Sequence, residues 1–245
     1  MVDFFFYITA SLGIILFGIS KGGFAGPASI LAIPIMSLSM SPLTAAGILL
    51  PILLIMDFLA IYFYWKKWEI NNIRIIIPPA LIGIFIGGIT FQITSADSIR
   101  ILVGIICLLF ISFSIFEKNN FIFNPTKNKG RFWSLISGYT SCIIHAGGQP
   151  LSFYLLPQKL NKTIYVGTMT LAFLVVNLVK LIPYYFLDLL IIQNLKISLL
   201  LSPLAPLSIY LGYYLHQKFN EESFYFIIYF FLAISGIKLI YDGMF

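Results

Sequence analysis

Apolar residues along the chain form ten segments, which fall into two sets of five. Most of the segments approach the length of about 20 residues that a helix needs to cross a hydrocarbon core of about 30 Å. None shows the alternation of apolar and polar residues that is typical of a membrane-spanning β-strand. The pattern therefore predicts an all-α polytopic membrane protein. The segments are 4–19, 27–41, 44–65, 73–92 and 98–116 in the first set, and 131–146, 150–158, 163–187, 195–214 and 222–242 in the second.

The two sets resemble each other at an offset of 123 residues. Proline, serine and tyrosine positions match in order along the chain, and so does the layout of the segments. Internal repeats of this kind are common in secondary transporters. The matched pairs include Pro27 with Pro150, Ser29 with Ser152, Pro34 with Pro157 and Tyr62 with Tyr185. We therefore predict a first transmembrane repeat over 1–116, a cytoplasmic basic linker over 117–130, and a second, inverted transmembrane repeat over 131–245.

A glycine-rich run separates the first two segments of each repeat. The first run extends from Lys21 to Pro27, and the second extends from His145 to Pro150. Glycine loosens the backbone and proline removes a hydrogen-bond donor, so we expect neither run to continue a helix. The short segment after each run then returns to the side it came from, which predicts a re-entrant helical hairpin followed by three transmembrane helices. Each repeat crosses the membrane an odd number of times, so the second copy is inverted.

The composition agrees with a membrane protein and excludes several other classes. Apolar residues make up 60% of the chain and charged residues 10%, whereas an average soluble domain is about 25% charged. The chain therefore has too few polar residues to cover a water-exposed surface. This excludes a soluble enzyme, a disordered protein, a coiled coil and a disulfide scaffold.

The net charge of +6 reflects basic residues in the connections between apolar segments. Basic residues of this kind orient helices in a membrane, so we expect a lipid bilayer as partner and no nucleic acid. With the N-terminus outside, ten basic residues lie inside and three outside. Two full crossings in place of each hairpin give the same orientation. The inside set is Lys66, Lys67, Arg74, Lys118, Lys127, Lys129, Arg131, Lys159, Lys162 and Lys218, and the outside set is Arg100, Lys196 and Lys238.

Lys21 stands before the first glycine pair, at a position predicted near mid-membrane. A charge at that depth costs at least a few kcal/mol and therefore needs a reason. One reason is an anion site, in which a nearby half-helix adds free N–H groups. The alternative is a lysine that snorkels to the interface or pairs with a carboxylate.

The second glycine run offers further groups for an anion. His145 and Gln149 are candidate hydrogen-bond donors, and His145 is also a candidate proton carrier; the alternative is a structural histidine at a helix end. We expect the backbone of both runs to approach the substrate closely. The glycines concerned are Gly22, Gly23, Gly147 and Gly148.

Asp57 and Lys180 lie inside apolar segments and are 123 residues apart, so the repeat places them at equivalent positions. Inverted copies bring equivalent helices together, and a direct Asp57–Lys180 ion pair lowers the burial cost of both charges. Such a pair is either structural or a gating or coupling element beside the substrate path. Asn177, one turn before Lys180, is expected to share its helix face.

Motifs of enzymes and of metal sites are missing from the sequence. It contains no His-Glu-x-x-His run, no paired cysteine ligands, no Gly-x-Ser-x-Gly elbow and no P-loop. We therefore expect no catalytic residues, no cofactor, no metal and no ATP hydrolysis.

These motifs resemble those of the sulfite exporter TauE/SafE family. The first signature corresponds to 18–24 with Pro34 beyond it, and the second to 145–150 followed by 154–157. The runs 166–168 and 177–180 fit the pattern that follows. The resemblance extends over nearly the whole chain. It implies a multi-pass protein of the bacterial inner membrane that transports small anions, notably sulfite, sulfonates and related organosulfur compounds.

The sequence thus predicts a secondary transporter, and more specifically an exporter, of small organosulfur or carboxylate anions. An inside-negative potential drives each negative charge outward with about 2.3 kcal/mol per 100 mV. The alternatives are an anion channel and a membrane-embedded enzyme. The oligomeric state is left open, with a homodimer as one alternative.

Overall fold

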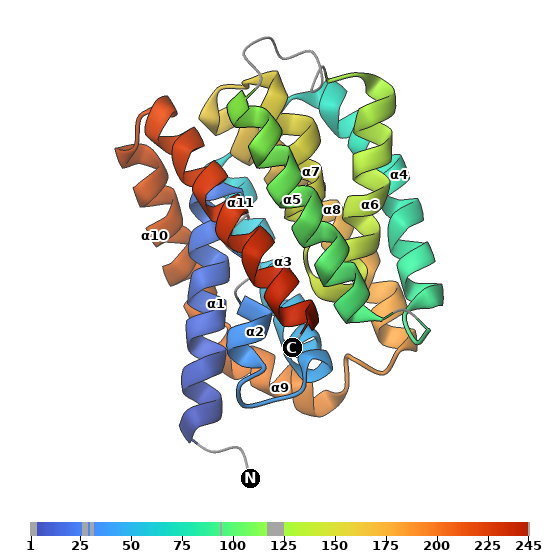
Figure 1. Cartoon of the computed structure of the whole chain (residues 1–245). Coiled ribbons are helices and arrows are strands. Elements are labelled where there is room, and N and C mark those ends of the chain that lie inside the picture. The colour runs from blue at the N-terminus through green and yellow to red at the C-terminus, as the bar shows by residue number, and fades with distance from the viewer. Residues whose placement is uncertain (1–3, 26–28, 30–31, 94, 117–124, 245) are drawn as a thin grey trace.

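Long helices run up and down between the two ends of the molecule (Figure 1). This computed structural model describes residues 4–25, 29, 32–93, 95–116 and 125–244, and these ranges contain helices and no strands. The predicted all-α class is therefore confirmed. The helices are α1 (Phe4–Phe24), α2 (Ala32–Met36), α3 (Pro42–Phe63), α4 (Ile70–Thr90), α5 (Ala96–Phe116), α6 (Lys127–Ile144), α7 (Gly148–Leu155), α8 (Lys162–Phe186), α9 (Ile192–Leu201), α10 (Leu204–Lys218) and α11 (Glu221–Met244).

Several of these helices meet the length and hydropathy expected of a membrane span. In the part of the chain that the structure describes, five do so individually: α1, α3, α4, α8 and α11. The pair α9 and α10 meets the same test together but is bent by 50° at the break between them. The segment predicted as one helix over 195–214 is therefore divided at Ser202 and Pro203, because a proline ring clashes with the preceding helical turn.

Polar side chains set where several helices begin. Ser41 accepts a hydrogen bond from the Thr44 amide at the start of α3, at 3.1 Å. Asn161 accepts one from the Thr163 amide at the start of α8, at 3.0 Å. The first amides of a helix lack partners within it, so such caps stabilise the helix by about 1 kcal/mol each.

The first glycine run does not break α1 where the sequence predicted. α1 continues through Gly22 and Gly23 and ends at Phe24. The reason is packing against α10, because a Cβ added to Gly22 would lie 2.5 Å from the carbonyl oxygen of Ile209. This close contact offsets the cost of about 1 kcal/mol for a helical glycine. Pro27 and its neighbours 26 and 28 lie outside the described residues.

The second glycine run interrupts the helix as predicted. α6 ends at Ile144 and α7 begins at Gly148, with three residues between them, His145, Ala146 and Gly147. Gly148, Gln149 and Pro150 form the first turn of α7. Proline is tolerated in a first turn, where its missing N–H has no helical partner to lose.

Glycine contacts also hold α4 against α6. A Cβ on Gly83 would lie 2.1 Å from the Leu135 carbonyl oxygen, and one on Gly138 would lie 2.0 Å from that of Ala80. Small residues of this kind let helix backbones approach closely in membrane proteins. The α4–α6 and α1–α10 contacts, here called the two glycine seams, each join a helix from 1–116 to a helix from 127–245.

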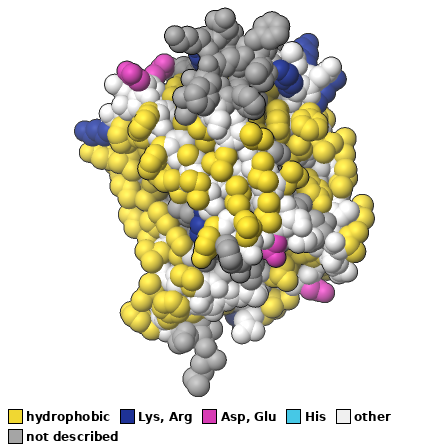
Figure 2. All heavy atoms as spheres, viewed as in Figure 1, with side chains coloured by type: hydrophobic (Ala, Val, Ile, Leu, Met, Phe, Trp, Pro, Cys, Tyr) yellow, Lys and Arg dark blue, Asp and Glu magenta, His cyan; other side chains and the backbone are white. Residues whose placement is uncertain are grey.

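The outer surface matches a lipid environment. Figure 2 shows hydrophobic side chains across the middle of one face, while most of the charged side chains on that face lie toward its two ends. Large apolar residues are widely exposed, among them Ile89 at 84% and Leu199 at 74%. A soluble monomer rarely exposes apolar patches on this scale.

The connections gather at two opposite ends of the bundle. The start of α6 and the α10–α11 connection lie at the upper end in Figure 1, and the N-terminal end of α1 and α9 lie at the lower end. This grouping agrees with the predicted sidedness of the connections. Which end faces the cytoplasm stays a prediction. Residues 117–124 of the predicted linker lie outside the described residues.

Candidate functional site

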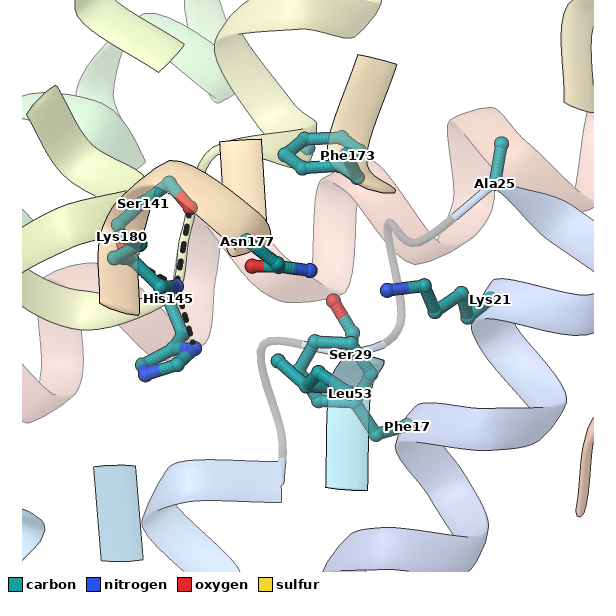
Figure 3. Close-up of a pocket in the computed structure, with 11 residues that line it drawn as sticks. Phe17, Lys21, Ala25, Ser29, Leu53, Ser141, His145, Phe173, Asn177 and Lys180 are labelled. Atoms are coloured by element: carbon teal, nitrogen blue, oxygen red, sulfur yellow. Dashed lines mark hydrogen bonds between the residues drawn. The ribbon is translucent and has the colours of Figure 1, made fainter. Parts of the chain in front are cut away.

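A small cavity lies among α1, α3, α6, α8 and the start of α7 (Figure 3). Its volume is about 30 Å³, which is room for only a few water molecules. The lining combines polar and charged groups with three large apolar side chains. The lining residues are Phe17, Lys21, Ala25, Ser29, Leu53, Ser141, His145, Gly148, Phe173, Asn177 and Lys180.

Helical spacing explains how these residues reach one place. α8 contributes Phe173, Asn177 and Lys180, which are four and three residues apart. Such positions lie on one face of a helix, as the sequence predicted for Asn177 and Lys180. Phe17 and Lys21 share a face of α1 for the same reason.

Lys21 forms a buried ion pair with Asp57. Its Nζ lies 2.7 Å from Oδ1 of Asp57, and the two side chains are 8% and 0% exposed. The other carboxylate oxygen, Oδ2, accepts a hydrogen bond from Asn177 Nδ2 at 2.7 Å. Lys21 therefore lines the cavity and pairs with a carboxylate at the same time, although the sequence presented these as alternatives.

The predicted direct pair between Asp57 and Lys180 is wrong. Lys180 instead donates to the Ser141 carbonyl oxygen at 3.1 Å and lies 3.2 Å from Nδ1 of His145. Equivalent positions in α3 and α8 put the two residues at corresponding levels but do not fix which partner each side chain reaches. Asp57 pairs with Lys21 of α1, whereas Lys180 contacts Ser141 and His145 at the end of α6.

The hydrogen bonds around His145 assign its tautomer. Nδ1 accepts from the Lys180 ammonium, and Nε2 lies 2.8 Å from the Tyr184 hydroxyl. That hydroxyl donates to the Cys142 carbonyl oxygen at 3.0 Å, so Nε2–H donates to Tyr184. Both ring nitrogens are thus engaged. In this arrangement His145 orients Lys180, and its donation to a bound anion stays a prediction.

The charges around the cavity do not cancel. Two lysines, Lys21 and Lys180, face one carboxylate, Asp57, while His145 is neutral in the assigned tautomer. All four residues are at most 6% exposed. A buried charge without a counter-charge is expensive, so this arrangement favours a ligand that brings one negative charge.

Of the remaining predicted residues, Gly148 lines the cavity and the other four do not. Gly147 packs against α6, where its carbonyl oxygen accepts from Ser137 Oγ at 2.7 Å. Gln149 is buried in α7 outside the lining, and Gly22 and Gly23 face α10.

Sequence reasoning missed six of the lining residues: Phe17, Ala25, Ser29, Leu53, Ser141 and Phe173. A signal existed for two of them. Ser29 matched Ser152 in the repeat, and Ser141 precedes His145 by one helical turn. Among the described residues, no group of three or more His, Cys, Asp or Glu is arranged to hold a metal ion.

Two helix ends beside the cavity adopt unusual backbone angles. Ala25, directly after α1, has φ 59°, and His145, directly after α6, has φ 54°. The left-handed region costs a residue other than glycine about 1–2 kcal/mol. Both residues line the cavity, and strained backbone of this kind often accompanies binding sites.

Comparison with known proteins identifies the family. The family model for the sulfite exporter TauE/SafE matches residues 11–239, nearly the whole chain. Searches of curated proteins and of solved structures found no match. The match confirms the resemblance that the glycine motifs indicated. With its multiple membrane-spanning helices and buried cavity, the protein belongs to the sulfite exporter TauE/SafE family of membrane transporters.

Proposed function

We propose that this protein is a secondary transporter that exports small anions across a bacterial inner membrane. The substrates that fit best are sulfite, sulfonates and related organosulfur or carboxylate compounds. The observation that carries the proposal is the buried cavity with two lysines against one carboxylate, between helices that span a membrane. Membership of the sulfite exporter TauE/SafE family also supports transport of a small anion.

The lining supports an anion with a compact polar head. The amine of Lys21 points into the space toward Asn177 and Ser29, as Figure 3 shows. These side chains offer an ammonium, an amide and a hydroxyl to oxyanion oxygens. Phe17, Leu53 and Phe173 provide an apolar wall that suits a short carbon chain. Gly148, at the start of α7, adds backbone N–H groups near the same space.

The tightness of the cavity favours a carrier over a channel. Lys21 and His145 are each 6% exposed and Lys180 is fully buried, so the lining has little contact with the surroundings. A channel requires a continuous open path, whereas a carrier alternates between closed and open access. Export then follows the inside-negative potential, at about 2.3 kcal/mol per charge and 100 mV.

The proposed carrier consists of two inverted repeats. The pattern of helix packing supports this. α1 packs against α10 and α2. Its counterpart α6 packs in the same way against α4, the counterpart of α10, and against α7, the counterpart of α2. α3 packs against α8, and α5 against α11, as equivalent helices do about a pseudo-two-fold axis. The cavity lies where the two copies meet.

The test is uptake into sealed proteoliposomes with labelled sulfite, sulfoacetate, taurine and simple carboxylates. We expect the wild type to move at least one anion and the Lys21→Ala variant to lose binding and transport. Lys21→Arg is expected to restore them only in part, because a guanidinium is larger and planar. Lys238→Ala on α11, outside the cavity, is the matched control and should behave as wild type.

Two comparisons make the test decisive. Removing Lys21 also strands Asp57, so Lys21→Ala/Asp57→Asn is measured alongside it to separate lost binding from lost folding. Unchanged anion affinity in folded Lys21→Ala would contradict the anion site. A channel would show fast flux without exchange of labelled for unlabelled anion, and an enzyme would turn over substrate in detergent without a sealed compartment.

A further inference from the structure

Asp57 occupies the place that a transported anion needs. Its carboxylate lies 2.7 Å from the Lys21 ammonium, a cationic group that points into the cavity. A bound anion that contacts Lys21 must therefore compete with a carboxylate already held by the protein. Asp57 is fully buried, so it has no access to water that would stabilise its charge instead.

Asp57 also differs from the other acidic residues of the described chain. Glu69 caps the start of α4, Asp97 lies in the first turn of α5, and Asp188 follows α8. Glu221 and Glu222 begin α11, and Asp242 lies near its end. In the described ranges, Asp57 is thus the one carboxylate in the middle of a membrane helix, where an ionised group is expensive and marks a function.

We propose that Asp57 is a built-in counter-ion that takes the substrate's place on Lys21 when the carrier is empty. This inference rests on the proposed transport function. An empty site with two unpaired lysines would be costly to move through the low-dielectric middle of the membrane. Asp57 reduces that excess, so the empty carrier returns and net transport proceeds. When the anion binds, it replaces one Asp57 oxygen on Lys21.

The surroundings of Asp57 let it release Lys21 without taking up a proton. Asn177 on α8 donates to Oδ2, while Lys21 on α1 contacts the other oxygen, Oδ1. Displacement from Lys21 therefore leaves one hydrogen bond in place. The other charged or titratable groups on the lining are Lys180, on the same face of α8, and His145 beyond α6.

The proposal separates two modes of transport that are normally measured together. In exchange, the carrier crosses loaded in both directions and never moves empty. In net efflux, it must return empty. Asp57→Asn removes the counter-ion but leaves Lys21 and Lys180, so labelled sulfite should still exchange, with a smaller loss of rate than net efflux shows. Net efflux should fall at least about tenfold, which corresponds to about 1.4 kcal/mol in the barrier of the return step.

The anion affinity gives an independent readout in the same variant. Because Asp57 competes for Lys21, Asp57→Asn should bind sulfite more tightly than the wild type. Asp57→Glu keeps the charge and should recover net efflux in part. Asp242→Asn removes a carboxylate at the end of α11, where it pairs with Lys238 away from the cavity, and should leave both modes unchanged.

A measurement on the wild type keeps the proposal testable if Asp57→Asn does not fold. Methanesulfonate is a permanent monoanion, so its transport releases and takes up no proton of its own. Net methanesulfonate efflux from liposomes that contain a pH-sensitive dye should leave the internal pH unchanged. An imposed pH gradient should likewise fail to drive its uptake.

The results that would overturn the counter-ion proposal differ from the result that would refute the proposed transport function. Proton movement with methanesulfonate would overturn the counter-ion and make Asp57 a proton carrier. Equal loss of exchange and net efflux in a folded Asp57→Asn protein, or no loss of either, would also overturn it. A wild type that moves no anion in either mode would instead refute the proposed function itself.

Discussion

Removing one member of the Lys21–Asp57 ion pair should destabilise the protein strongly, and removing both should restore much of the stability. Two unit charges 2.7 Å apart attract each other by about 6 kcal/mol at an effective dielectric constant of about 20. Desolvation opposes this attraction, so the measured effect is smaller. Breaking a buried pair by truncating one partner typically costs about 3–5 kcal/mol, because the other charge stays buried and unpaired.

The perturbations are Lys21→Met, Asp57→Asn and the double variant, arranged as a double-mutant cycle. The free energy of unfolding is measured in detergent micelles by titration with a denaturing detergent. Each single variant should lose about 3–5 kcal/mol, and the double variant should lose clearly less than the sum of the two. Asn177 remains able to donate to an asparagine oxygen at position 57, so part of the local hydrogen bonding is retained.

A parallel double-mutant cycle with Lys180→Met and Asp57→Asn tests whether Asp57 pairs with Lys21, as in the structure, or with Lys180, as the repeat predicted. Lys180 bonds to Ser141 and His145, so its coupling energy with Asp57 should be the smaller of the two. The partly exposed pair Lys238–Asp242, whose side chains are 35% and 19% exposed, is the control and should couple by about 1 kcal/mol or less. Coupling below about 1 kcal/mol between Lys21 and Asp57, or stronger coupling of Asp57 to Lys180, would refute the reasoning.

Three further predictions concern packing, hydrogen bonding and orientation. Gly22→Ala should destabilise the protein by about 1–3 kcal/mol in the same unfolding assay, because its Cβ meets backbone of α10, whereas Leu12→Ala on the exposed face of α1 should cost less. Tyr184→Phe should cost about 1–3 kcal/mol by leaving a buried imidazole N–H without an acceptor; a neutral result would contradict the assigned tautomer. In whole cells, a cysteine introduced at Ser95 should react with a membrane-impermeant thiol reagent and one at Gln217 should not, and the reverse labelling would overturn the predicted orientation.

The helices were predictable from the sequence because long apolar runs leave few other structures in a membrane. The end of α6 was also visible, since glycine, glycine and proline follow His145 within five residues. The continuation of α1 was not visible. Local propensity disfavours Gly22 and Gly23 in a helix, and the contact that outweighs it comes from α10, far along the chain.

The sequence predicted which residues belong to the candidate site better than it predicted which residues contact each other there. Lys21, His145, Asn177 and Lys180 all line the cavity, because an ionisable or amide group inside an apolar segment stands out in any sequence. The partner of Asp57 was predicted wrongly. Equivalence under a repeat gives a position along a helix, whereas an ion pair depends on which neighbouring helix lies within reach of a side chain.

The two glycine seams have a consequence for how the protein is made. α1 and α4 emerge from the ribosome and enter the membrane well before α10 and α6, the helices that cover their glycine faces. During that interval the closely fitting surfaces of the first half can face only lipid or each other. A nascent chain halted after α5 therefore holds neither glycine seam. The α4–α6 seam can close once α6 has been made, whereas the α1–α10 seam closes only near the end of synthesis.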